Sequence, residues 1–188
     1  MAVHSFTMAI GEAVLSRLWA WNPANEADWD ALYAQQLPRV LNYFRYRVGD
    51  GAVAEDLTSL TFEKAWIARN RYRRDLASFA TWLMTIARNV AVDHYRSRRV
   101  HAPLAVAEHV ASSDSPERDA VLRSDLVRLS ALLGALPERE REIIALKYGG
   151  ERTNREIAKQ MNLSESNVGT ILHRTVQGLR AGFEEGGL

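Results

Sequence analysis

The segment that most restricts the fold of this 188-residue chain is TNREIAKQMNLSESNVGTILHR, residues 153–174. Ile157 and Met161 are four residues apart, so they share one face of a first helix. Asn162 suits a turn with left-handed backbone, which its short polar side chain tolerates. Ser164 is a typical N-cap for a second helix. The segment therefore predicts two short helices joined by a sharp turn.

Small and apolar residues at fixed positions predict how these two helices pack. Ala158 is small where the second helix must approach closely, and Leu163 fills the corner. Val168, Ile171 and Leu172 give the second helix a buried face. This pattern indicates a DNA-binding helix-turn-helix at residues 154–173, with a helical hairpin that has no DNA role as the alternative.

The exposed positions of the second helix favour contact with DNA. Ser, Thr and Asn side chains hydrogen-bond base edges, and Asn suits adenine. Free N–H groups in the first helical turn can hold a phosphate. Gly169 costs up to about 1 kcal/mol of helix propensity and lets another backbone approach closely. The DNA-contact candidates are Arg155, Ser164, Glu165, Ser166, Asn167, Thr170, His173 and Arg174.

Basic charge is concentrated in one part of the chain. The formal net charge is only +1, but residues 69–99 carry eight arginines against Asp75 and Asp93. Arginine presents a planar fork that can bind phosphate through two hydrogen bonds. This stretch therefore favours nucleic acid as a partner over a merely solvated face.

Several functional classes find no support in the sequence. The absence of cysteine excludes disulfides and thiolate metal sites and suits a reducing compartment. No apolar run approaches the roughly 20 residues that span a bilayer, and no signal peptide is evident, so we expect a cytoplasmic protein. The five histidines are scattered, and we find no paired carboxylates and no phosphate-binding glycine loop. We expect no enzyme, cofactor, metal or small-molecule substrate.

Helical periodicity dominates and predicts an all-α fold of two small helical modules joined by a flexible linker. The first module, 26–100, should hold three long helices with the basic loop RNRYRRDLA between the last two. The linker, 101–115, contains Pro103 and a Ser-Ser-Asp-Ser cluster. The second module covers 116–184. Residues 1–25 are an extension, expected to fold onto the body as an amphipathic helix, with docking of a partner as the alternative.

Two parts of the chain resemble one protein family. AEDLTSLTFEKAW and SFATWLMTIARNVAVDHYRSRR resemble conserved region 2 of the extracytoplasmic-function (ECF) sigma factors of bacterial RNA polymerase. LPEREREIIALKYGGERTNREIAKQMNLSESNVGTILHRTVQGLR resembles their region 4. The resemblance covers about residues 28–182, with a linker where larger sigma factors carry region 3. Two modules in the right order are far more specific than either motif alone.

This resemblance implies a non-catalytic initiation factor that directs promoter-specific transcription. The implied partners are core RNA polymerase, through its β′ clamp coiled coil and β flap, promoter DNA, and a controlling anti-sigma factor. The helix-turn-helix would read the −35 element. The implied core-polymerase contacts are Asp56, Leu57, Ser59, Leu60, Phe62 and Trp66. The implied contacts that read and melt the −10 element are Tyr72, Arg73, Arg74, Phe79, Arg88, Asn89, Asp93, Arg96 and Arg99.

Some of these roles have alternatives. Tyr72 and Phe79 could stack on an extruded base, but a core position is favoured for Phe79 and Trp82. Asn89 and Asp93 either read a base edge or brace their helix. For Phe62 and Trp66, burial in the core and service as an exposed anchor are both open.

The sequence also departs from the family pattern. Ser59 and Leu60 replace a frequent Gln-Glu pair, which predicts a more apolar docking contact. The family often has Lys or Arg where residues 169–172 stand, which predicts weak −35 binding. A response-type regulator with a terminal helix-turn-helix is the alternative function. Such a regulator usually carries a ligand-binding or phospho-acceptor domain with strands, whereas this first half is helical and Arg-rich.

Overall fold

The computed structural model describes residues 23–101 and 116–185, with side chains from 29 to 97 and from 124 to 184. Within these ranges the predicted all-α fold is confirmed, and no strand is present. Most of the predicted extension, 1–25, and of the predicted linker, 101–115, lies outside the described residues. The chain divides into two compact units, residues 1–35 and 36–188, and each is considered by itself.

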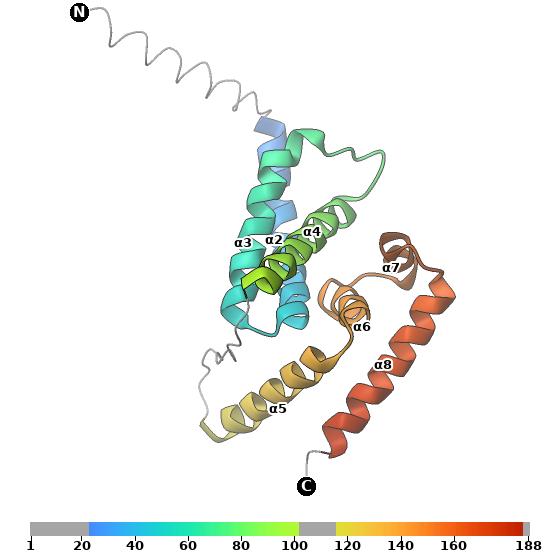
Figure 1. The fold of residues 1–188 in the computed structure, drawn as a ribbon. Helices are drawn as coiled ribbons and strands as arrows, with labels where there is room; N and C mark the ends of the chain where they lie inside the picture. The colour runs from blue at the N-terminus through green and yellow to red at the C-terminus, as the bar shows by residue number, and fades with distance from the viewer. Residues whose placement is uncertain (1–22, 102–115, 186–188) are drawn as a thin grey trace, which may run out of the picture. The chain divides into compact units, whose positions relative to one another are not determined.

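Figure 1 shows the helices in chain order. They are α2 (Pro23–Val48), α3 (Gly51–Ala68), the short 3₁₀ turn η1 (Arg69–Arg71), α4 (Phe79–His101), α5 (Pro116–Ala135), α6 (Glu138–Ile144), the π-helical turn η2 (Ala145–Gly149), α7 (Asn154–Met161) and α8 (Glu165–Glu185). The unit 36–188 begins within α2.

Gly49-Asp50-Gly51 separates α2 from α3. Gly49 adopts a φ of +78°, a left-handed conformation that glycine reaches without strain. Asp50 then caps α3 by accepting a hydrogen bond from the N–H of Val53 at 3.0 Å. These two local choices end one helix and start the next, which lets α3 fold back beside α2.

Apolar residues from α2, α3 and α4 form one core. Val40 and Phe44 of α2, Ala65 of α3, and Leu83 and Val90 of α4 are all buried. α3 packs along α4. Burial of this kind stabilises by about 25 cal/mol for each Å² of apolar surface removed from water. α4 starts where the sequence predicts, because the Ser78 hydroxyl accepts a hydrogen bond from the N–H of Thr81 at 3.3 Å.

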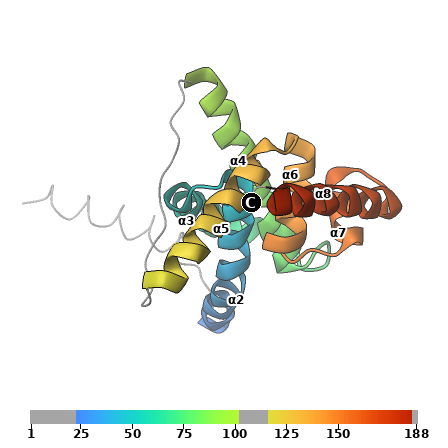
Figure 2. The ribbon, with the colours of Figure 1, turned by 90° about the horizontal axis from the view of Figure 1, so that it is seen from below.

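The remaining helices pack around α8. α8 contacts α5, α6 and α7, and α7 lies beside the first turns of α8 (Figures 1 and 2). Ile143, Ile144 and Leu146 supply the centre of this second core and are almost completely buried. α8 is thus held along its length, which fixes the direction in which its exposed side chains point.

Candidate nucleic-acid and protein interfaces

The helix-turn-helix has the local geometry that its sequence predicts. Thr153 forms a capping box with Glu156, in which each side chain satisfies a backbone N–H of the other. Asn162 ends α7 in the left-handed conformation, with φ 55° and ψ 51°. Ser164 then accepts a hydrogen bond from the N–H of Asn167 at 3.1 Å and caps α8. The predicted turn is therefore confirmed.

One face of α8 is buried and the opposite face is open. Val168, Ile171 and Leu172 are buried against the rest of the module, as their spacing predicts. Every DNA-contact candidate of this motif is exposed: Arg155, Ser164, Glu165, Ser166, Asn167, Thr170, His173 and Arg174. The structure thus places hydroxyl, amide and basic groups together on one accessible surface. This set can donate to and accept from base edges in a major groove.

Two details qualify this surface. The guanidinium of Arg174 lies 3.1 Å from the carboxylate of Glu140 in α6, so its charge is partly balanced within the protein. Gly169 points toward α7 rather than toward open solvent, and a Cβ built there would lie 3.8 Å from the Asn154 side-chain nitrogen. That is ordinary van der Waals contact. No close approach requires glycine at position 169.

The basic loop before α4 is built around an aromatic cluster. The ring of Tyr72 lies 5.6 Å from that of Phe79 and 5.1 Å from that of Trp82, measured between centroids. Phe79 is buried, whereas Tyr72 and Trp82 are half-buried. The core position favoured for Phe79 is therefore found, and Phe79 offers no open face to a base because its neighbours cover it. Tyr72 remains the partly accessible aromatic of the predicted stacking pair.

The arginines of this segment have different surroundings. Arg73 and Arg74 are exposed, and Arg73 makes a two-pronged ion pair with Asp75 at 2.7 and 2.8 Å. The hydrogen bond between them raises the pKa of Arg73 and lowers the pKa of the Asp75 carboxyl. This pairing holds the Arg73 guanidinium in one orientation at the surface. Such a charge is available to a phosphate that displaces Asp75.

On α4, three of the predicted DNA residues form one exposed stripe. Asn89, Asp93 and Arg96 are exposed. Asp93 lies 3.6 Å from Lys64 of α3, an ion pair that braces the two helices. Arg88 is the exception, because it is half-buried and lies 3.5 Å from Glu142 of α6. The side chain of Arg99 lies outside the described residues.

The candidates on α3 divide between core and surface. Leu57 and Phe62 are only 7% and 6% exposed, so these two predicted polymerase contacts belong to the core. The other four predicted residues are exposed, and Ile67, which the sequence argument missed, is 71% exposed. We call the exposed set the α3 docking face: Asp56, Ser59, Leu60, Trp66 and Ile67.

Trp66 is the largest apolar side chain of the α3 docking face. It is 40% exposed, and the Arg69 guanidinium lies 4.1 Å from its ring centroid. Arg69 also donates a hydrogen bond to the Trp66 carbonyl at 2.8 Å. These contacts hold the indole in place without covering it. Of the open alternatives for the aromatic pair, Phe62 takes the core and Trp66 the surface.

A buried charge cluster joins helices that are distant in sequence, and no periodic pattern indicated it. Glu142 of α6 accepts from the Nε of Arg47 at 2.6 Å and from the Tyr43 hydroxyl at 3.0 Å, both of α2. We call this group the Glu142 cluster; its members are Glu142, Arg47, Tyr43 and Arg88. Burial, and then the Glu142 carboxylate, raise the pKa of Tyr43 well above its ordinary value. Burial alone would lower the pKa of Arg47, but Glu142 and two tyrosines raise it overall.

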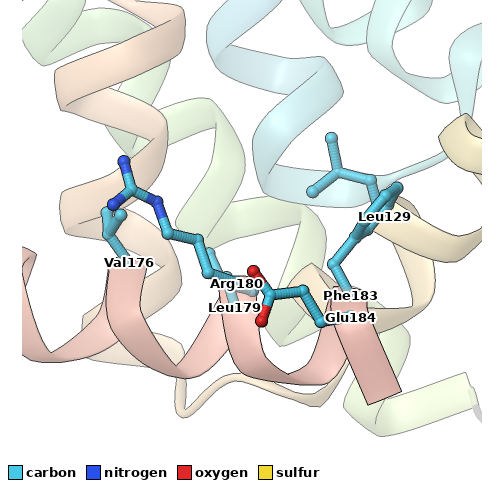
Figure 3. Close-up of a pocket in the computed structure, with 6 residues that line it drawn as sticks. All are labelled: Leu129, Val176, Leu179, Arg180, Phe183 and Glu184. Atoms are coloured by element: carbon cyan, nitrogen blue, oxygen red, sulfur yellow. The ribbon is translucent and has the colours of Figure 1, made fainter. Parts of the chain in front are cut away.

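A shallow apolar groove lies between α5 and α8 (Figure 3). Its apolar walls are one leucine of α5 and the valine, leucine and phenylalanine side chains of α8, with one arginine and one glutamate of α8 beside them. Phe183 also receives the guanidinium of Arg128, 4.7 Å from its ring centroid. The lining residues are Leu129, Val176, Leu179, Arg180, Phe183 and Glu184.

Two other kinds of site are absent from the described ranges. No group of three or more His, Asp or Glu side chains there is arranged to hold a metal ion. No helix among the same residues has the length and apolar content needed to cross a membrane.

Comparison with known protein families identifies both halves of the chain. Residues 32–100 match sigma-70 region 2, and residues 126–178 match sigma-70 region 4. The match at residues 32–100 argues against a response-type regulator, which would carry a different domain there. Members of the matched family act as initiation factors and not as enzymes.

Individual sigma factors from several bacteria also match most of the chain. The ECF sigma factor BldN of Streptomyces coelicolor is 36% identical over 163 residues, which cover 83% of this chain and 61% of BldN. The sigma factor CarQ of Myxococcus xanthus is 32% identical over 155 residues, covering 81% of this chain and 87% of CarQ. SigM of Bacillus subtilis is 27% identical and covered over 96% of its length.

Solved structures share the fold. The sigma factor RpoE, in complex with the anti-sigma factor NepR from Bartonella quintana, matches with a TM-score of 0.67 at 21% identity, over 84% of this chain and 97% of RpoE. CnrH, in complex with the cytosolic domain of CnrY, matches with a TM-score of 0.60 at 23% identity, over 90% and 94%. With both regions matched in order, and CarQ covered over most of its length, this chain belongs to the ECF sigma factors of bacterial RNA polymerase.

Proposed function

We propose that this chain binds core RNA polymerase in the cytoplasm and directs it to promoters by reading their −10 and −35 elements. In this proposal residues 26–100 bind polymerase and melt the −10 element, and residues 116–184 read the −35 element. One observation carries the proposal. Beside an arginine-rich segment, the chain exposes two further surfaces of different chemistry, the α3 docking face and the recognition face of α8.

The α3 docking face suits a protein partner. It combines the apolar side chains of Leu60, Trp66 and Ile67 with the acidic Asp56. A large aromatic side chain held in place at the centre of an interface supplies much of the binding energy. The partner would be the clamp coiled coil of the polymerase β′ subunit. The acidic residue favours basic groups on that partner and sets its orientation.

The basic loop and the exposed stripe of α4 suit partly melted DNA. Arg73, Arg74 and Arg96 would hold phosphates, whose release of counterions drives binding at low salt. Extruding a base from the stack costs a few kcal/mol, which stacking on a protein surface can offset. Tyr72 is the accessible aromatic for this role, whereas Phe79 supports it from the core.

The recognition face of α8 would enter the major groove at the −35 element. It is rich in hydroxyl and amide groups and carries little free positive charge, so we expect it to bind weakly alone. Two weak DNA-binding modules on one polymerase-bound chain act together, because binding of the first raises the effective concentration of the second. Polymerase would thus supply the affinity that each module lacks.

The groove between α5 and α8 is lined mainly by apolar side chains, and apolar grooves of this kind can bind the apolar face of a partner helix. In this proposal its occupant is the tip of the polymerase β flap, which would hold residues 116–184 over the −35 element. Control by an anti-sigma factor is also part of the proposal. It is supported by RpoE and CnrH, which share this fold and were solved with NepR and with the cytosolic domain of CnrY.

Reconstitution tests this function. The purified chain is added to bacterial core RNA polymerase, and the promoters that the mixture selects from fragmented genomic DNA are sequenced. We expect specific initiation that requires both components. Tight promoter binding without polymerase, together with failure to co-purify with it, would exclude the proposal in favour of a conventional regulator.

A further inference from the structure

The recognition face of α8 has few groups of its own that can hold a phosphate. Residues 163–172 contain neither Lys nor Arg. Arg174, farther along the helix, is balanced by Glu140. The Thr170 hydroxyl donates to the Ser166 carbonyl at 3.1 Å, so its proton is already used within the helix. Other donors for a phosphate are found beside α8, in η2 and α7.

Lys147 of η2 and Asn154, the first residue of α7, are joined through their side chains. The Lys147 Nζ donates a hydrogen bond to the Asn154 Oδ1 at 2.8 Å. Because an ammonium group can only donate, the amide oxygen must face Lys147 and the amide nitrogen must point away from it. Both side chains are half-buried, so the pair is held in place and is still reachable from solvent. The contact fixes the direction in which the amide presents its two N–H donors.

Gly169 leaves this amide uncovered. A Cβ built at Gly169 would lie 3.8 Å from the Asn154 Nδ2, so any longer side chain at this position would start beside the amide and lie over it. Gly169 lies three residues after Ser166 and four before His173, and these two recognition residues are exposed. The Asn154 amide therefore reaches the edge of the recognition face through the gap that Gly169 leaves.

The positive charge behind the amide is not balanced by a carboxylate. Within the part of the chain that the structure describes, Lys147 forms no ion pair and no group accepts a hydrogen bond from the Asn154 Nδ2. The carboxylate of Glu156 in α7 is itself occupied by Thr153 and Arg152. An amide with two free N–H donors and an ammonium group behind it favours an anionic acceptor over a neutral one. In DNA the anionic acceptor is the phosphodiester.

We propose that Lys147, Asn154 and Gly169 form a phosphate site at the edge of the recognition face, which takes one phosphodiester of the −35 element. The Asn154 amide donates to a phosphate oxygen, Lys147 supplies positive charge, and Gly169 acts by its lack of a side chain. The inference rests on the proposed function of residues 116–184 and assigns one contact within it. Such a contact positions the helix-turn-helix on the duplex, whereas contacts to base edges specify the sequence.

Asn154→Asp separates this site from a merely structural role of the pair. The carboxylate has nearly the shape of the amide and still accepts from Lys147, and a negative charge in the first turn of α7 suits the helix dipole. Thermal unfolding should therefore show a stability equal to that of the wild type or higher. The variant loses both N–H donors and repels phosphate. Its affinity for a −35 duplex should fall at least about tenfold, the scale of a lost hydrogen bond to a charged group.

The salt dependence of binding tests the role of Lys147. The affinity is measured with holoenzyme, formed from the full chain and core RNA polymerase, by competition between −35 duplexes of promoters recovered in the reconstitution. Lys147→Met should reduce the slope of log affinity against log salt concentration by about 0.9, the value for one phosphate. Arg139→Met removes an exposed charge from α6 and is the matched control, which should keep the wild-type slope. An unchanged slope in Lys147→Met would overturn the inference.

Gly169→Leu tests the gap. Leucine would cover the amide, so this variant should weaken −35 binding, and it keeps the fold because leucine favours a helix more than glycine does. Gly178→Leu is the matched control, because a Cβ at that exposed position of α8 meets nothing within 4 Å. It should bind like the wild type. In an Asn154→Ala background Gly169→Leu should cause no further loss, whereas additive losses would show that the two positions act separately and would contradict the site.

Substitution of the DNA identifies the acceptor. Each phosphate of the −35 duplex is replaced in turn by an uncharged methylphosphonate. One such position should weaken binding by the wild type and have no effect on Asn154→Ala. A randomised −35 library should give the same sequence preference with both forms. A changed preference would assign the amide to a base edge and exclude the phosphate site.

These experiments separate the inference from the function on which it rests. A wild-type chain that neither binds core polymerase nor selects promoters would exclude the proposed function, and the phosphate site with it. If wild-type holoenzyme reads a −35 element and folded Asn154→Asp reads it equally well, the function stands and the phosphate site does not.

Discussion

The carboxylate of Glu142 in α6 lies 2.6 Å from the Nε of Arg47 in α2, and both side chains are almost fully buried. The two residues are 95 positions apart in the sequence. Such a pair adds little net stability, but loss of one partner leaves a charge without compensation in a dry environment. The pair therefore selects one packing of the two modules over others.

Glu142→Gln should lower the free energy of unfolding far more than Glu151→Gln. Breaking a buried pair costs about 3–5 kcal/mol, because the charge of Arg47 is left without its partner. The pair of Glu151 with Arg39 is partly exposed and should be worth at most about 1 kcal/mol. Urea unfolding of both variants measures the difference. Equal losses would show that the Glu142 cluster has no special energetic role.

Substitutions of exposed and of buried residues of α3 should have different effects. Ile67→Glu and Trp66→Ala should weaken binding to core polymerase at least tenfold, the scale of an interface hot spot, with little change in stability. Leu57→Ala and Phe62→Ala should destabilise the fold by about 2–5 kcal/mol because they leave cavities. Thermal unfolding and fluorescence anisotropy with labelled polymerase separate the two effects. Normal polymerase binding by the Ile67 and Trp66 variants would exclude the α3 docking face.

Arg73→Ala with Arg74→Ala should impair open-complex formation more than −35 binding. The reason is that these arginines lie in the basic loop before α4, outside the helix-turn-helix. Each phosphate contact that is lost should also make DNA binding less dependent on salt concentration. Permanganate footprinting measures melting of the −10 element, and competition with a −35 duplex measures −35 binding. Arg45→Ala, which removes an exposed charge from α2, is the control. Equal loss of both steps in the double variant would contradict this division of labour.

Exchanging the side chains of Asn167 and Thr170 should change which −35 sequence is preferred. Both residues are exposed on α8, and amide and hydroxyl groups recognise different base edges. Selection of −35 variants from a randomised promoter library, with holoenzyme of each form, gives the preference directly. An unaltered preference would move base recognition to other residues of this helix.

Stability at acid pH should depend on Glu156. Burial alone would raise the pKa of this carboxyl, but hydrogen bonds from Thr153 and the charge of Arg152 lower it below the ordinary value of 4.5. The stabilisation is therefore complete above that value and is lost as the pH falls through the lowered pKa. Urea unfolding should show a smaller loss between pH 7 and pH 3 for Glu156→Gln than for wild type.

Thr153→Ala provides the second arm of this experiment. It removes the capping hydroxyl and should reduce the same pH-dependent loss, because that hydroxyl stabilises the ionised carboxylate. Identical pH dependence in wild type and Glu156→Gln would show that other carboxylates govern acid unfolding.

Local patterns in the sequence were enough to predict the helix-turn-helix. Asn162, Ser164 and the apolar positions of α8 act within one or two helical turns, so their roles depend on neighbours in sequence. The same holds for the stop at Gly49. It was harder to predict from the sequence whether a residue at the edge of an apolar stripe is buried or exposed. Phe62 and Trp66 are one helical turn apart, yet the first is core and the second is surface.

Periodicity and capping were enough to predict the all-α class, the order of the helices and the exposure of the DNA-contact candidates on α8, because both act between near neighbours in the chain. Three contacts could be found only in the folded chain: Gly149 lies against the α2 backbone, Glu142 pairs with Arg47, and Arg88 lies beside Glu142 of α6. These contacts join residues about 50 to 110 positions apart. They exist only when two modules pack in one register, and no local pattern of residues encodes that register.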